Sequence, residues 1–152
     1  MILKENTVAP LFTLPDETGK DRSLADYLGK DIVLYFYPKD ETSGCTTEAC
    51  NFRDDYSAYE KAGVVILGVS PDSPASHAKF KANHQLPFTL LADEEHKVCE
   101  LYGAWGKKQM YGREYEGVLR TTYLISKEGK ITKVFENVKP AEHSAEILAL
   151  IK

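Results

Sequence analysis

Apolar runs separated by turn-forming residues divide the chain into alternating strands and helices. Continuous apolar runs, typical of strands covered on both faces, occur at Ile32–Tyr37 and Val64–Val69. Shorter strands are predicted at Ala9–Leu14, Pro87–Ala92, Thr121–Ile125 and Ile131–Phe135. The last two flank a glycine-containing turn, which indicates an antiparallel hairpin. Another turn is predicted at Asp16–Lys20.

Apolar positions at helical spacing predict five helices. They are a short helix capped by Ser23 and ending at Gly29, and the segments Thr47–Lys61, Pro74–His84, Glu94–Tyr102 and Ala141–Ile151. Strands joined by helices run parallel, whereas the late hairpin must be antiparallel. The sequence therefore predicts an α/β fold with a mixed central β-sheet flanked by helices on both faces.

The segment Trp105–Val118 has no clear period and is rich in glycine and tyrosine, so it is predicted to be irregular or hairpin-like. The overlapping segment Tyr102–Tyr115, with Trp105, Met110 and Tyr111, is a candidate to frame a substrate or partner surface. We favour a loop packed over the sheet.

Length and composition set the class of the protein. The 152 residues predict a single domain, 1–152, and a net charge of −4 argues against nucleic acid or an anionic membrane as the main partner. No apolar run approaches the ~20 residues of a membrane span, and the N-terminus does not resemble a signal peptide. Three cysteines in a protein expected to be cytoplasmic indicate thiol chemistry or burial.

The most informative polar segment is Cys45-Thr-Thr-Glu-Ala-Cys50, which follows the strand Ile32–Tyr37 after a short turn. A helix is predicted to begin around Cys45, so this thiol lies beside the positive end of the helix dipole and the unpaired N–H groups of the first turn. Both favour the thiolate, which is the reactive form. We expect Cys45 at the carboxyl end of a central strand, on a polar, exposed rim.

Cys45 and Cys50 are too far apart to form a disulfide within an intact helix. Five residues give a rise of about 7.5 Å and leave the side chains about 140° apart, so the Cα atoms lie roughly 8.6 Å from one another. A disulfide needs about 4.4–6.8 Å. If the two ever join, the first turns must unwind, which costs little at a helix end. Taken alone, Cys50 could simply face the core.

The segment Phe36–Cys50 resembles the active site of a peroxiredoxin, most closely of the bacterioferritin comigratory protein or peroxiredoxin Q group. Its Pro38-x-x-x-Thr42-x-x-Cys45 spacing is specific to that superfamily. Further similarity covers nearly the whole chain, in Ala9–Phe12, Val69–Asp72, Phe88–Asp93, Tyr102–Trp105 and Arg120–Ile125. The resemblance implies a thioredoxin-like fold and a thiol-dependent peroxidase, for which we expect neither a cofactor nor a metal.

The resemblance also implies roles for five residues. Cys45 is the peroxidatic nucleophile that becomes a sulfenic acid, and Cys50 is the resolving cysteine that then forms a Cys45–Cys50 disulfide. Thr42 holds thiolate and peroxide, Pro38 shields the pocket from water, and Arg120 stabilises negative charge. Without the resemblance, Thr42 is a turn or N-cap hydroxyl, Pro38 ends a strand and Arg120 is a solvated rim residue.

One position departs from the family's Thr-Pro-Gly-Cys pattern. Ser43 replaces the proline, so the turn is less preorganised, and Ser43→Pro is predicted to raise stability. Cys99 has apolar neighbours at helical spacing and is assigned to the core, with a fallback role as resolving thiol. Glu48 carries no obvious chemistry. No metal-ligand spacing is found among the histidines, His77, His84, His96 and His143.

We therefore expect a peroxidase that reduces hydrogen peroxide and organic hydroperoxides and is restored by thioredoxin or a related dithiol reductant. A monomer is expected, because both cysteines lie in one chain. Two alternatives are a thiol–disulfide oxidoreductase without peroxidase activity and a redox sensor or holdase-like protein whose helix opens on oxidation. The first is disfavoured because four residues, not two, separate the cysteines. Oxidation without multiple turnovers would favour the second.

Overall fold

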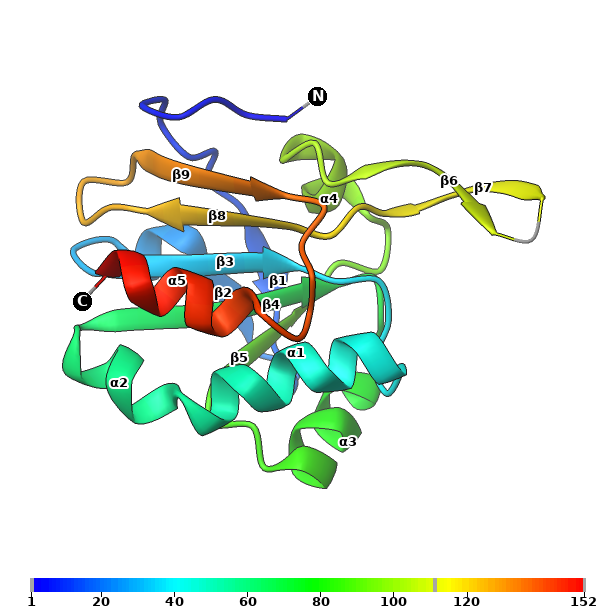
Figure 1. Cartoon of the computed structure of the whole chain (residues 1–152), viewed down its shortest axis with the longest axis horizontal. Coiled ribbons are helices and arrows are strands. Elements are labelled where there is room, and N and C mark those ends of the chain that lie inside the picture. Colours follow the sequence, from blue (N-terminus) through cyan, green and yellow to red (C-terminus); the bar gives the residue numbers. More distant parts are fainter. Residues whose placement is uncertain (1, 111, 152) are drawn as a thin grey trace.

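A five-stranded mixed sheet forms the centre of the computed structural model, which describes residues 2–110 and 112–151 (Figure 1). In spatial order its strands are β5 (Thr89–Ala92), β4 (Val64–Ser70), β3 (Asp31–Phe36), β8 (Thr121–Ile125) and β9 (Ile131–Glu136). The strands β3, β4 and β5 are parallel, whereas β8 and β9 are antiparallel additions. The predicted mixed sheet is confirmed.

Helices cover both faces of this sheet. One face carries α1 (Ser43–Asp54), α2 (Tyr56–Lys61), α3 (Pro74–His84) and α5 (His143–Ile151), with α1, α2 and α5 in front of the sheet in Figure 1. The other face is covered by the 3-10 turn η1 (Leu24–Tyr27), by α4 (Lys97–Leu101) and by the hairpin of β1 (Thr13–Pro15) and β2 (Asp21–Ser23). The sheet therefore separates two hydrophobic cores.

The central strand β3 leads directly to the site. All of its residues after Asp31 are buried, as its continuous apolar run predicts. Phe36 pairs with Val69 of β4 and with Thr121 of β8. Because β8 runs antiparallel to β3, the end of β3 and the start of β8 meet at one edge of the sheet. The loop of residues 37–42 connects this edge to α1.

The predicted helix Thr47–Lys61 is in fact two helices. It begins four residues earlier, at Ser43, and it breaks at Asp55, whose backbone (φ −94°, ψ 3°) leaves the helical region. The Asp55 carboxylate accepts a hydrogen bond from the Ser144 hydroxyl (2.7 Å). A tertiary contact with α5 therefore accompanies the break in a helical pattern that looked continuous.

Other predicted elements are shorter than the sequence suggested. The strand expected at Pro87–Ala92 is β5, and the helix expected at Ala141–Ile151 is α5; each begins two residues later. Of the expected strand Ala9–Leu14, only the end lies in a strand, Thr13–Pro15, which pairs with β2 outside the central sheet. The turn Asp16–Lys20 is confirmed, and the Asp16 carboxylate accepts hydrogen bonds from two backbone N–H groups within it. The helix expected over Glu94–Tyr102 is the shorter α4.

The segment expected to pack over the sheet instead projects from the body as a hairpin (Figure 1). Its strands are β6 (Trp105–Met110) and β7 (Arg113–Val118). The hairpin-like prediction for this segment is confirmed. The expected packing over the sheet is wrong, because these strands are rich in charged residues and offer little apolar surface to bury; the first four residues of β7 are exposed. Tyr111 lies outside the described residues.

Candidate active site

Cys45 lies in the first turn of α1. The first hydrogen bond within the helix runs from the Thr46 N–H to the Thr42 carbonyl (2.8 Å), so the preceding N–H groups have no partner inside the helix. These groups and the helix dipole stabilise a thiolate. The expected exposed rim position is wrong: Cys45 is 1% exposed, because α1 packs its inner face against the sheet.

Arg120 immediately precedes β8 and reaches across the sheet edge to α1. Its Nη2 lies 3.0 Å from Cys45 Sγ, and its Nη1 lies 3.1 Å from Glu48 Oε1. Gly44 permits this approach, because a Cβ there would lie 2.9 Å from Nη2. The structure therefore brings together Cys45 and Arg120, which the resemblance had paired in function.

Glu48 belongs to this site, although no pattern in the sequence assigned it a role. Its side chain is 1% exposed and forms an ion pair with Arg120. Burial raises the pKa of Glu48 from 4.5 to about 7, against the opposing effect of the positive charge of Arg120. Helical glutamates are normally solvated, and this ion pair joins residues 72 positions apart. No local pattern could have revealed the burial of Glu48.

Thr42 and Pro38 border the turn between β3 and α1. Thr42 occupies the N-cap position, and its hydroxyl donates to the Lys39 carbonyl (2.9 Å) instead of capping the helix. This is the turn role expected without the resemblance. A hydroxyl that donates its proton in this way keeps its lone pairs available to accept a hydrogen bond. Pro38 is half-buried.

The three cysteines are free and occupy different environments. Cys50 is half-buried on α1, five residues after Cys45. Cys99 is fully buried on α4, on the opposite face of the sheet from Cys45. Burial and the negative charge of Asp93 raise the pKa of the Cys99 thiol. The core assignment of Cys99 is confirmed, and a Cys45–Cys99 disulfide would require the sheet to open.

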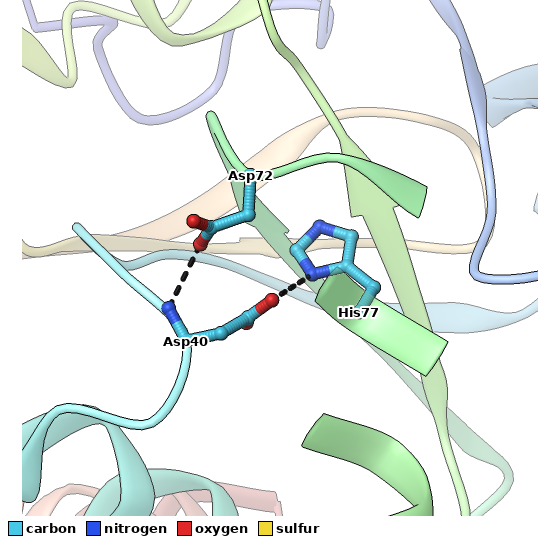
Figure 2. A group of neighbouring side chains, drawn as sticks. All are labelled: Asp40, Asp72 and His77. Carbon is cyan, nitrogen blue, oxygen red and sulfur yellow. Dashed lines mark hydrogen bonds and ion pairs between the residues drawn. The ribbon is translucent and has the colours of Figure 1, made fainter. Parts of the chain in front are cut away.

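A buried hydrogen-bond network fixes the loop that precedes α1. The Asp40 carboxylate, on a residue that is 6% exposed, accepts hydrogen bonds from the side chains of Tyr37 (2.6 Å) and Ser76 (2.8 Å) and lies 2.7 Å from Nδ1 of His77. Its backbone N–H donates to Asp72 (2.8 Å), as Figure 2 shows. The loop is thereby tied both to α3 and to the segment that follows β4.

Potential metal-ligating atoms of Asp40, Asp72 and His77 lie within 4.8 Å of one another, a grouping that the spacing of the histidines did not predict. His77 donates through Nε2 to the Leu91 carbonyl (2.9 Å), while its Nδ1 faces Asp40. Asp72 also accepts from the Ser70 hydroxyl (2.6 Å). Because these groups already have hydrogen-bond partners within the protein, we interpret the cluster as a structural network.

Comparisons with known proteins show the family of this chain. Residues 6–134 match the AhpC/TSA family. The chain is 50% identical over 148 residues to a putative peroxiredoxin bcp of Coxiella burnetii, covering 97% of this chain and 98% of that protein. It is 49% identical over 152 residues to peroxiredoxin Bcp of Bacillus subtilis, covering 100% and 97%. The chain belongs to the AhpC/TSA family, as a peroxiredoxin of the Bcp group.

Solved structures of peroxiredoxins have the same fold. A cysteine-to-serine mutant of Xylella fastidiosa PrxQ matches with a TM-score of 0.93 at 30% identity, covering 99% of this chain and 96% of that one. The Xanthomonas campestris bacterioferritin comigratory protein, whose structure concerns alkyl peroxide reduction, matches with a TM-score of 0.87 at 37% identity, covering 92% and 89%. The thioredoxin-like fold is confirmed.

As a peroxiredoxin, this protein is a thiol-dependent peroxidase. Family membership sets aside the oxidoreductase without peroxidase activity and favours an enzyme over a redox sensor or holdase-like protein. No helix among residues 2–110 and 112–151 is long and apolar enough to cross a membrane.

Proposed function

We propose that Cys45 is the peroxidatic cysteine of this peroxiredoxin and Cys50 its resolving cysteine. The observation that carries the proposal is the 3.0 Å contact between Arg120 Nη2 and Cys45 Sγ in the first turn of a helix. The guanidinium and the helix N-terminus both favour the thiolate. The burial of Cys99 behind the sheet and the position of Cys50 in the same helix as Cys45 support Cys50 as the resolving thiol.

In the first step the Cys45 thiolate attacks the terminal oxygen of a hydroperoxide. The S–O bond forms and the O–O bond breaks, so sulfur is oxidised to a sulfenic acid and the leaving oxygen takes a proton to become an alcohol or water. Arg120 stabilises the negative charge that moves onto the leaving oxygen. Thr42 offers an acceptor to the peroxide O–H, and Pro38 shields the site from water.

In the second step Cys50 attacks the sulfenic sulfur. The S–S bond forms, the S–O bond breaks and the oxygen leaves as water with the proton of the Cys50 thiol. This step requires α1 to unwind, because its helical geometry separates the two Cα atoms by roughly 8.6 Å. Thioredoxin or a related dithiol reductant then restores both thiols. The cycle runs within a monomer, in the reducing cytoplasm where such reductants act.

Hydrogen peroxide and organic hydroperoxides are the proposed substrates. The alkyl peroxide reduction of the Xanthomonas campestris relative supports the organic class. The buried Cys45 thiol reacts only with the terminal O–OH group of the substrate. Both classes of hydroperoxide carry this group. The two classes can be compared in one assay by measuring kcat/KM for hydrogen peroxide and for cumene hydroperoxide.

A coupled assay with thioredoxin, thioredoxin reductase and NADPH tests the proposal. Peroxide-dependent NADPH oxidation is expected to disappear in Cys45→Ser and to persist in the matched control Cys99→Ala. Mass spectrometry of peroxide-treated protein is expected to show a bond between residues 45 and 50. Turnover in Cys45→Ser would refute the role of Cys45, and a bond between residues 45 and 99 would refute that of Cys50.

A further inference from the structure

Two acidic groups on α1 share one guanidinium. Arg120 contacts Cys45 through Nη2 (3.0 Å) and Glu48 through Nη1 (3.1 Å). Cys45 and Glu48 are three residues apart and therefore lie on the same side of the helix. Both are 1% exposed, so water screens their charges little. A thiolate and a carboxylate together carry two negative charges against the single positive charge of Arg120.

Side chains from the other elements packed around the site do little to neutralise the Glu48 carboxylate. From β3 comes Tyr35, a fully buried phenol whose hydroxyl has no hydrogen-bond partner in the described part of the chain. Burial and the negative charge of Glu48 raise the pKa of Tyr35. From β6 comes Lys108, whose ammonium donates to the Val118 carbonyl (2.8 Å) and whose pKa is lowered by burial and by Arg120. An ionised Glu48 is therefore costly in the wound helix.

Glu48 also lies inside the segment that must unwind. The loop before α1 is held to α3 by Asp40, and Arg53 near the end of α1 donates to the His84 carbonyl (2.8 Å). These two anchors confine unwinding to the part of α1 between them. Once unwound, Glu48 meets water, where its carboxylate ionises at an ordinary pKa. By linkage, ionised Glu48 favours the unwound segment and protonated Glu48 favours the helix.

We propose that Glu48 is a positioning residue whose charge controls the winding of α1. Its protonated form holds Cys45 in the wound helix that reacts with peroxide, and its ionised form favours the unwound segment in which Cys50 reaches Cys45. This inference rests on the proposed Cys45–Cys50 disulfide. It makes resolution pH-dependent: the sulfenic acid persists longer at pH 6 than at pH 8 and is correspondingly more open to a second oxidation by peroxide.

Hydrogen exchange of the amides of residues 44–50 tests the control of winding. In a Cys45→Ser background, which removes the thiol, the equilibrium constant for opening of this segment, corrected for intrinsic exchange rates, is expected to rise about tenfold from pH 6 to pH 8. Adding Glu48→Gln is expected to abolish the rise. Adding Glu60→Gln, on the exposed side of α2, is expected to preserve it. A rise that survives Glu48→Gln would overturn the proposal.

Rapid-quench mass spectrometry after one equivalent of peroxide tests the consequence for the reaction. The rate of Cys45–Cys50 disulfide formation rises with pH in any variant, because Cys50 attacks as a thiolate. The ratio of the wild-type rate to the Glu48→Gln rate isolates Glu48 and is expected to grow about tenfold between pH 6 and pH 8. A constant ratio would overturn the role of Glu48.

The outcomes separate this inference from the proposed function. If no Cys45–Cys50 disulfide forms in the wild-type protein, the proposed function fails. If the disulfide forms with the same pH profile in both proteins, only the role of Glu48 fails. Should Glu48→Gln not fold, the Cys45→Ser protein alone decides, because an opening equilibrium that does not rise with pH would refute the control of winding by Glu48.

Discussion

Gly44 gives Arg120 room to reach the thiol. Glycine has no Cβ, and a Cβ at this position would lie only 2.9 Å from Arg120 Nη2. Gly44→Ala is therefore expected to displace the guanidinium and to lower kcat/KM for peroxide by about tenfold or more. Alanine suits a helix better than glycine, which offsets the stability lost when Arg120 moves away from buried Glu48, so the melting temperature is expected to change little. Steady-state assays and thermal melts measure both quantities.

Gly117→Ala on the projecting hairpin is the matched control, because the nearest atoms to its new Cβ lie at 3.4 Å. Its peroxidase activity is expected to match that of the wild-type protein. An unchanged kcat/KM in Gly44→Ala would show that Arg120 tolerates the displacement.

Cys99 is predicted to be chemically silent in the folded protein. It is fully buried, and burial and Asp93 keep it in the thiol form by raising its pKa. After oxidation of the other two cysteines, alkylation with iodoacetamide is expected to label Cys99 at least about a hundredfold faster in denaturant than in buffer. Peptide mass spectrometry follows the label. Rapid labelling of the native protein would contradict its placement behind the sheet.

At the scale of single residues, the sequence predicted the reactive cysteine but not all of the side chains that surround it. Cys45 and Arg120 were predictable because their motifs resemble a known active site. Glu48 was missed because its burial depends on Arg120, 72 positions along the chain. The Asp40–His77 contact was missed for the same reason, since a bend in the loop and the placement of α3 bring these residues together.

At the scale of elements, Ser43 is the first residue of α1, a position that favours proline because its N–H has no partner within the helix. Thr42 before it is extended (φ −79°, ψ 152°), as a residue preceding proline should be. Ser43→Pro is expected to stabilise the protein by about 0.4–1 kcal/mol, or about 1–4 °C in thermal melts. A lower melting temperature would indicate strain at this turn.

Helices also differ in how far their own residues determine where they begin and end. The bounds of α3, Pro74–His84, were predicted correctly, because Ser73 caps the helix through the Ser76 N–H and Pro74 suits its first turn. The break between α1 and α2 could not be predicted. It accompanies a contact between Asp55 and Ser144, two residues that only the packed fold brings together.

At the scale of the whole molecule, buried His143 connects α5 to the sheet. Its Nε2 lies 2.7 Å from Thr122 Oγ1, and burial lowers its pKa although Glu146 opposes the shift. The folded protein therefore binds this proton less readily than the unfolded chain. The stability that neutral His143 contributes is present above pH ~6.5 and is lost as the pH falls through its lowered folded-state pKa.

Replacing His143 tests this dependence. In His143→Gln, the loss of unfolding free energy between pH 7 and pH 5 is expected to be smaller than in the wild-type protein. Urea denaturation at several pH values measures the difference, and His84→Gln, on a side chain that is 25% exposed, is the control. An equally steep loss in His143→Gln would show that other groups cause the acid sensitivity.

The overall architecture was largely predictable, because the spacing of apolar residues and the positions of turn-forming residues indicate a parallel core followed by an antiparallel hairpin. The projection of β6 and β7 was not, since it depends on how little these strands can bury against the rest of the molecule.

The pairing of β3 with β8 brings together residues that are synthesised at different times during translation. Cys45 and Arg120 are 75 positions apart, and they meet only when the register between these strands is complete. During synthesis, the thiol emerges well before its guanidinium partner exists. Its special reactivity therefore appears only at the end of assembly, so a nascent or misregistered chain carries an ordinary thiol that lacks the activation provided by Arg120.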